Sequence, residues 1–479
     1  MPEIKDRNVV WSWAASAVCF AVLMLYHFRS DGYSDIGDGI LHYQISHYSW
    51  KHPELLLHHW GKPFFTLISS PFAQLGYNGI VFFNILCASA TAFFSSRMLS
   101  AAGYKFGAVA GMLSVFSPLY FSVTLSGLTE PLFSLVLTLS VFLVMKGRSG
   151  WAATLVSFLP FVRTEGFLLL PLFGLVFLIR KNWKAIPFLA FGTLIYSLVG
   201  GIATGNFGWV ITGNPYTGEE LYGHGEFFHF IKNNEAFLGT SGVVLFAVAF
   251  VLLIVRLVKY KKQHPLFAEE VVLVFGSFIV YLLAHSIFWA YGLFGSYGLL
   301  RVMAAVTPLA AVAAAGTLDL LYSKINQRRA WIPFGLAMVV VVVNTIQTLN
   351  QSRLPFRIDN SQYAAYHAGK WLKEHTQEKN ILYTQHPFIV FLADYDPFDR
   401  QYTRTLWDLE AEKNNKQLPV QGSLIVWDSH FAALEGRTSV DSLKSNVNYE
   451  VVYHVKSEKA EYRTSGGNEW PEVYIFKQK

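Results

Sequence analysis

The stretch that decides the fold is VVWSWAASAVCFAVLMLYHF, residues 9–28, which runs directly into RSDGYSDIGDGILHY, residues 29–43. The first part contains no Asp, Glu, Lys or Arg, and it has the length of about 20 residues that an α-helix needs to cross a bilayer. The second part carries three acids, Asp31, Asp35 and Asp38. Acids so close to a bilayer are costly and usually mark function. An apolar segment followed directly by three acids predicts a membrane helix that leads into a functional loop.

Most of the remaining chain is also apolar. It is 53% hydrophobic and 15% charged, whereas globular domains average about 25% charged residues. We expect about eleven spans, at residues 9–28, 77–98, 107–123, 128–145, 151–162, 166–179, 185–203, 237–257, 271–291, 299–322 and 331–348. The predicted fold class is therefore a polytopic α-helical membrane protein. Its transmembrane domain covers residues 1–350 and has a long first loop at 29–76.

The last part of the chain has the composition of a soluble domain. Residues 361–374 have the pattern of an amphipathic helix, and residues 380–383, 422–427 and 450–454 have that of short strands. This alternation predicts a small α/β domain over residues 351–479.

Basic residues fall in alternate connections between the spans. They are Lys5, Arg7, Arg97, Lys105, Lys146, Arg148, Arg180, Lys181, Lys184, Arg256, Lys259, Lys261, Lys262, Lys324, Arg328 and Arg329. Such alternation is the positive-inside pattern of membrane proteins, so the net charge of +6 indicates no nucleic-acid partner. The connections at 31–76, 124–127, 163–165, 204–236 and 292–298 then face outward, as does the C-terminal domain.

Residues 151–179 are the ambiguous part of this topology. One helix of this length would place Arg163 and Glu165 in its middle and would break the charge alternation. Two short helices that turn at these residues preserve the alternation. Each would be too short to cross the roughly 30 Å core, so we expect Arg163 and Glu165 to lie in a cavity below the outer surface.

The unusual polar residues of the spans share the outer face under this topology. They are Asp35, Asp38, Glu130, Arg163, Glu165 and Arg301. An arginine neutralises a lipid phosphate by bidentate contact, and a carboxylate takes a proton from an incoming hydroxyl. Together these groups suit the transfer of a sugar from a polyprenyl-phosphate donor.

Each of these residues also has a simpler interpretation. Arg163 and Glu165 would pair only to keep a hairpin neutral, and Arg301 would be a lipid anchor. Glu130 would favour the N-terminus of its helix. Asp35 and Asp38 would be turn residues of a glycine-rich loop.

The first loop also contains a dense histidine group and two tryptophans. The spacing of His42, His47, His52, His58 and His59 matches no zinc pattern, so we expect no metal and no other cofactor. A divalent ion is the less favoured alternative. Trp50 and Trp60 fit an interfacial belt better than sugar stacking.

Four motifs, in order, resemble the GT-C superfamily of integral membrane glycosyltransferases. Residues 38–43, DGILHY, look like its first-loop motif; residues 128–133, LTEPLF, and 161–166, FVRTEG, are similar to segments of its dolichyl-phosphate-mannose-dependent members. Residues 298–301, GLLR, followed by Pro308, look like a further helix start. Many members carry a paired acid in the first loop, whereas Gly39 follows Asp38 here. This departure puts a metal-assisted mechanism in doubt.

The resemblance implies a transferase that moves a mannose-like sugar from a polyprenyl-phosphate donor to a glycan, lipid or protein acceptor. The implied catalytic residues are Asp38, favoured as general base, and Asp35. The expected substrate-binding residues are Arg301, Arg163, Glu130, Glu165, His42, Tyr43, His59, Trp60, Lys62 and Tyr297.

Two alternatives remain from the sequence alone. A transporter or flippase for lipid-linked saccharides should have internal repeats and polar residues at mid-membrane, and neither is evident. A membrane scaffold for the C-terminal domain would leave the acids and arginines unexplained. We expect a bacterial inner membrane location, with the endoplasmic reticulum membrane second.

Overall fold

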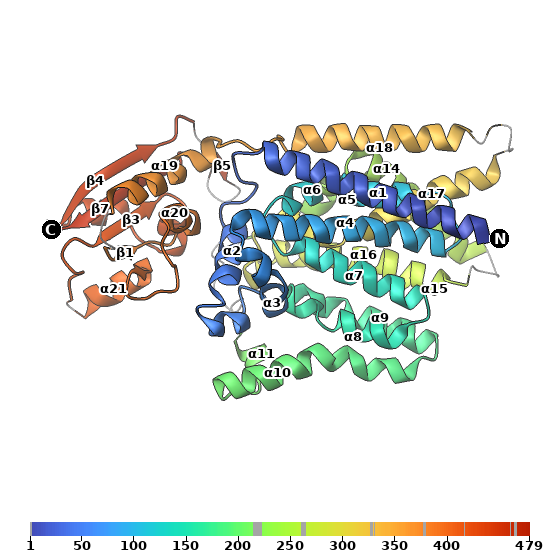
Figure 1. Cartoon of the computed structure of the whole chain (residues 1–479), viewed down its shortest axis with the longest axis horizontal. Helices are drawn as coiled ribbons and strands as arrows, with labels where there is room; N and C mark the ends of the chain where they lie inside the picture. Colours follow the sequence, from blue (N-terminus) through green and yellow to red (C-terminus); the bar gives the residue numbers. More distant parts are fainter. Residues whose placement is uncertain are drawn as a thin grey trace.

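The computed structural model describes residues 2–213, 223–259, 265–325, 329, 331–376, 380–415, 417–459, 461–463 and 467–479. Figure 1 shows a body of roughly parallel helices that joins a small domain built around a sheet. The N-terminus lies at the far end of the helical body, and the C-terminus lies in the small domain. Lys261, Lys262 and Arg328 of the predicted basic connections lie outside the described residues.

Helices long and apolar enough to cross a membrane are present throughout the helical body. Among the described residues there are six: Asn8–Arg29 within α1 (Pro2–Arg29), Tyr77–Ala101 (α4), Trp183–Thr204 (η4 and α10), Thr240–Lys259 (α14), Phe267–Ala290 (α15, η5 and α16) and Trp331–Gln351 (α18). The polytopic α-helical membrane fold is confirmed. The number of eleven spans is not, because several of the predicted spans are short or bent.

The span predicted at 107–123 is one of the bent ones. It consists of α5 (Gly107–Val115) and α6 (Pro118–Thr124), whose axes differ by 66°. Ser117 has an extended backbone before Pro118, as expected because proline disfavours the helical conformation in the residue before it.

Shorter apolar helices account for other predicted spans. They are α7 (Glu130–Met145) and the two arms Ser149–Phe161 (α8 and η2) and Thr164–Ile179 (η3 and α9). The last two confirm that residues 151–179 form two short helices rather than one. The span predicted at 299–322 is η7 (Leu300–Ala305) followed by α17 (Thr307–Lys324).

The long first loop is structured. It contains α2 (Asp38–Tyr48), η1 (Pro53–Leu57) and α3 (Pro63–Ala73). These elements lie at the end of the helical body that faces the C-terminal domain, opposite the N-terminus (Figure 1). Asp38 is the first residue of α2.

The C-terminal domain has a five-stranded mixed sheet with the order β2-β1-β3-β7-β4. The strands are β1 (Leu382–Tyr383), β2 (Thr403–Arg404), β3 (Leu424–Asp428), β4 (Tyr449–Lys456) and β7 (Glu472–Gln478), with β5 (Glu461–Arg463) and β6 (Gly467–Glu469) in a separate pair. The helices are α19 (Asn360–His375), α20 (Pro387–Leu392), α21 (Leu406–Asn414) and α22 (Val440–Lys444). Parallel pairing of β1 with β2 and β3, beside antiparallel pairing of β7, confirms the predicted α/β character.

The domain packs against the first loop through apolar and charged contacts. The ring of Tyr33 lies 4.7 Å from that of Phe388, and Ile40 is buried in the same apolar cluster as the domain's core. Asp396 accepts hydrogen bonds from Lys51 at 2.8 Å and from His52 at 2.9 Å. These contacts hold the domain over the end of the helical body that carries the acidic loop.

Candidate active site

Arg301 joins the two acids of the first loop. Its guanidinium donates one hydrogen bond to Asp35 and another to Asp38. Arg301 lies in η7, just before α17, and Asp38 is the first residue of α2. Arg301 therefore does not extend into lipid as an anchor. It joins the first loop to the segment that leads into α17.

Asp35 and Asp38 have different surroundings. The second carboxylate oxygen of Asp35 accepts hydrogen bonds from the backbone amides of Gly37 at 3.1 Å and Gly39 at 2.7 Å. Asp35 thus holds the turn that begins α2, as the turn interpretation predicted. The side chain of Asp38 is 33% exposed, against 17% for Asp35. Asp38 is therefore the more accessible of the two carboxylates.

Two glycines bring this turn close to the start of α7. A Cβ atom on Gly127 would lie 2.1 Å from the carbonyl oxygen of Gly39, and one on Gly39 would lie 3.4 Å from the backbone nitrogen of Gly127. Only glycine at position 127 permits this backbone approach. It places Asp38 next to the segment that leads into Glu130.

A second ionic group surrounds Arg163. Its guanidinium donates to Glu130 at 2.7 Å and to Glu165 at 2.9 Å. Glu130 is fully buried at the first position of α7, so it lies at the favourable end of the helix dipole and in an ion pair. The predicted pairing of Arg163 with Glu165 is present, with Glu130 as a further partner.

Lys62 and His42 of the first loop are buried beside these groups. The Lys62 ammonium donates to the hydroxyl of Thr164 at 3.3 Å. Burial lowers the pKa of Lys62 to about 8, although the carboxylate of Glu165 opposes this shift. Burial lowers the pKa of His42 to about 3 against the attraction of Asp38, so this imidazole is neutral at pH 7.

The pKa of Asp38 is set by two opposing effects. Burial raises it, but the positive charge of Arg301 and its hydrogen bond outweigh burial and hold the pKa below its ordinary value. Asp38 is therefore ionised near neutral pH and is a weaker base while Arg301 remains its partner.

Two residues of the Arg163 group were not predicted from the sequence. Tyr281 and His285 lie one helical turn apart on α16 (Gly276–Ala290), and both are buried. The His285 Nε2 atom is 3.7 Å from Glu165 Oε1, beyond hydrogen-bond distance. A histidine inside an otherwise apolar span was the available signal, because ionisable residues there are rare and usually functional.

Several buried polar atoms around the two arginines have no hydrogen-bond partner in the described part of the chain. They are Glu130 Oε2, Arg163 Nε, Tyr281 OH, His285 Nε2 and His42 Nδ1. An unsatisfied buried polar group costs about 1–3 kcal/mol. Such a concentration of unsatisfied groups is typical of a site that receives a polar ligand.

The other predicted binding residues pack against aromatic rings or are partly buried. Tyr43 packs among the rings of Tyr77 and Phe391, and His59 lies 4.2 Å from the ring of Trp209. Trp60 and Tyr297 are partly buried in the segments before α3 and η7. Substrate binding by these four residues, as by the others, stays a prediction.

The direct contact of Arg301 with Asp38 was not expected from the sequence. An arginine and two partly buried carboxylates at one interface attract each other and pair. Among the described residues, no three His, Cys, Asp or Glu side chains are grouped to hold a metal ion.

Comparison with known proteins identifies the fold. Neither a protein-family model nor a curated protein matches the sequence. The crystal structure of ArnT from Cupriavidus metallidurans bound to undecaprenyl phosphate aligns with a TM-score of 0.61 and 11% identity, over 96% of this chain and 97% of that one. ArnT in the apo state aligns with a TM-score of 0.60 and 10% identity, again over 96% of this chain and 97% of that one. The chain therefore has the fold of ArnT.

Proposed function

We propose that this protein is a membrane glycosyltransferase that uses a polyprenyl-phosphate-linked sugar. The single observation that carries the proposal is the contact of Arg301 with both Asp35 and Asp38, next to the Arg163 group. It brings an arginine, the kind of group that binds phosphate, and a carboxylate, the kind of group that accepts a proton, together at one end of a membrane fold. The fold of ArnT, a protein crystallised with undecaprenyl phosphate, supports a lipid phosphate as the donor's carrier.

The reaction needs one bond to form and one to break. The acceptor hydroxyl attacks the anomeric carbon, and the bond between that carbon and the phosphate oxygen breaks. The electron pair goes to the phosphate oxygen, and the hydroxyl proton goes to Asp38. A positioned general base typically contributes about 10²–10⁴ in rate, and the arginine charge stabilises the departing phosphate.

Asp38 is the better candidate for the base. Asp35 is held by Arg301 and by two backbone amides, so it stabilises the turn. Asp38 is more exposed and makes a charged contact with Arg301. We infer that the donor phosphate takes the place of Asp38 on Arg301. That exchange frees Asp38 and, by neutralising the nearby charge, raises its pKa toward that of a more effective base.

We assign recognition of the sugar to the Arg163 group. The unpartnered atoms of Glu130, Arg163, Tyr281 and His285 include both donors and acceptors, as sugar hydroxyls require. The resemblance of residues 128–133 and 161–166 to mannose-dependent members supports a mannose-like sugar. The location that we propose is a bacterial inner membrane, with the C-terminal domain outside.

A transporter or flippase is not favoured. The acids and arginines of the Arg301 and Arg163 groups lie at one end of the helical body, whereas a transporter requires a site near the bilayer midplane. A transfer assay separates the two functions. Purified protein in detergent is incubated with a panel of undecaprenyl-phosphate sugars and a lipid or glycan extract, and release of undecaprenyl phosphate is measured. Release with at least one sugar supports the proposal; movement of labelled donor across vesicles without its cleavage would contradict it.

A further inference from the structure

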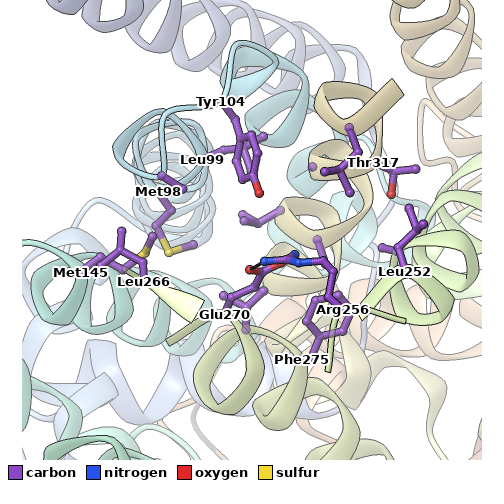
Figure 2. A pocket seen from close by; sticks show the side chains of 17 residues that line it. Met98, Leu99, Tyr104, Met145, Leu252, Arg256, Leu266, Glu270, Phe275 and Thr317 are labelled. Carbon is purple, nitrogen blue, oxygen red and sulfur yellow. Dashed lines mark hydrogen bonds and ion pairs between the residues drawn. The ribbon is translucent and has the colours of Figure 1, made fainter. Parts of the chain in front are cut away.

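A pocket lies at the opposite end of the helical body from the candidate active site. Its walls come from the ends of α4, α7 and α14, from η5 (Glu270–Phe275) and from α17. Its accessible volume is about 50 Å³, several times the roughly 10–15 Å³ that one water needs in this measure. Figure 2 shows apolar side chains around it, among them Met98, Leu99, Met145, Leu252 and Phe275.

One ion pair interrupts this apolar wall. Arg256 donates two hydrogen bonds to Glu270, at 2.6 and 2.8 Å, and its guanidinium also lies 4.8 Å from the centre of the Phe267 ring. In Figure 2 the pair faces the same space as the hydroxyl of Tyr104. The charges of Arg256 and Glu270 thus lie side by side at a pocket that is otherwise lined mainly by apolar side chains.

The charge pattern predicts that the pocket lies at the level of lipid headgroups. Arg256 and Lys259 lie in the last turn of α14, and Glu270 begins the π-helical turn of the next span. This end of the helical body carries the basic connections that the charge pattern assigns to the cytoplasmic side. π-helical turns occur frequently at functional sites. The ion pair therefore lies where phosphates and headgroup amines of the inner leaflet meet the protein.

The charges discriminate between headgroups. Because Glu270 balances Arg256, the pair offers no excess positive charge to an anionic lipid. A zwitterionic headgroup complements it instead, with its phosphate near Arg256 and its amine near Glu270. A carboxylate has about four acceptor positions, and the two bonds from Arg256 leave acceptor capacity for an ammonium. A primary ammonium donates hydrogen bonds, whereas a quaternary choline cannot.

We propose that this pocket binds a phosphatidylethanolamine-type lipid. Its primary ammonium contacts Glu270, its phosphate contacts Arg256, and one acyl chain enters the apolar part beside Met98 and Met145. This site is separate from the proposed transfer reaction and does not depend on it.

Lipid retention by the full-length protein tests the proposal. The purified protein is supplied with dioleoyl phosphatidylethanolamine, phosphatidylcholine or phosphatidylglycerol in detergent, and bound lipid is counted by native mass spectrometry. We expect the ethanolamine lipid to be retained at least about fivefold better than the other two. Equal retention of the ethanolamine and choline lipids would overturn the proposal.

Two variants locate the bound lipid. Glu270→Gln should reduce retention of the ethanolamine lipid to the level of the choline lipid. Ala313→Trp fills the apolar part and should abolish retention, whereas Val244→Trp, at a residue of α14 that is 57% exposed, should not. Equal retention by the two tryptophan variants would overturn the site even if Glu270→Gln fails to fold. A thermal unfolding temperature in detergent close to that of the unaltered protein serves as the check that Ala313→Trp is folded.

Discussion

Arg301 donates a hydrogen bond to Asp38 across a separation of 263 residues. The contact joins the first helix of the outer loop to the segment before α17, and Asp35 shares the same guanidinium. A lipid phosphate that binds Arg301 must therefore compete with a carboxylate of the protein. This competition couples donor binding to release of the proposed base.

Asp38→Asn should separate binding from chemistry. The amide is nearly isosteric but cannot accept the proton, so we expect the transfer rate to fall by about 10²–10⁴. Binding of undecaprenyl phosphate, measured by tryptophan fluorescence, should stay equal or become tighter, because the competing charge is gone. Asp35→Asn is the matched control. Near-normal turnover by Asp38→Asn together with an inactive Asp35→Asn would assign the base to Asp35. Near-normal turnover by both variants would exclude the mechanism.

Arg301→Lys should weaken use of the donor although it keeps the charge. Lysine lacks the planar fork that contacts phosphate at two points, and a hydrogen bond to a charged group contributes about 1.5–3 kcal/mol. We expect kcat/KM for the donor to fall by roughly tenfold or more, mainly through KM. Unchanged kinetics would show that Arg301 serves only to hold the loop.

Lys62 should give the reaction an alkaline limit. Its pKa of about 8 means that the ammonium is charged below pH 8 and loses its charge as the pH rises through that value. If the charge attracts the donor phosphate, kcat/KM should decrease above about pH 8. Lys62→Arg, which stays protonated, should move this decrease to higher pH; an identical profile would exclude Lys62 as its source.

Glu130→Gln should destabilise the protein strongly. The change leaves Arg163 with one of its two acidic partners in a buried site, and breaking a buried ion pair costs about 3–5 kcal/mol. We expect a lower thermal unfolding temperature in detergent. The triple variant Glu130→Gln/Arg163→Met/Glu165→Gln should recover part of the loss, since it leaves neither the cation nor an acid of the group without a partner; no recovery would show that Glu130 acts through other contacts.

Reporter fusions test the sidedness of the site. A reporter placed after Asn350, at the end of α18, and one inserted near Gly213 should both be extracytoplasmic. A fusion after Lys146 should be cytoplasmic. A cytoplasmic signal at Asn350 or Gly213 would contradict the positive-inside assignment on which the outward-facing site rests.

The sequence was sufficient for properties that depend on local composition. A run of about 20 apolar residues needs a bilayer or a core wherever it occurs, so the span at 9–28 and the two short arms at 151–179 were predicted correctly. The acids near the first span were predicted to be functional because charged residues so close to a bilayer are costly. The helix at 361–374 and three strands also followed from local patterns, whereas β2 and β7, α20 and α21 were not predicted.

Only the tertiary structure decided which of these groups meet. Asp38 and Arg301, or Arg163 and Glu130, come together through the packing of α2, α7 and η7, which no local pattern encodes. Tyr281 and His285 join the site because one face of α16 turns inward, and hydropathy averages over that face. The span count is not confirmed, for a related reason: helices packed against protein rather than lipid can be short or bent and still keep their backbone hydrogen bonds. The sequence determined the kinds of groups available and the segments that carry them, while packing determined the pairs in which they act.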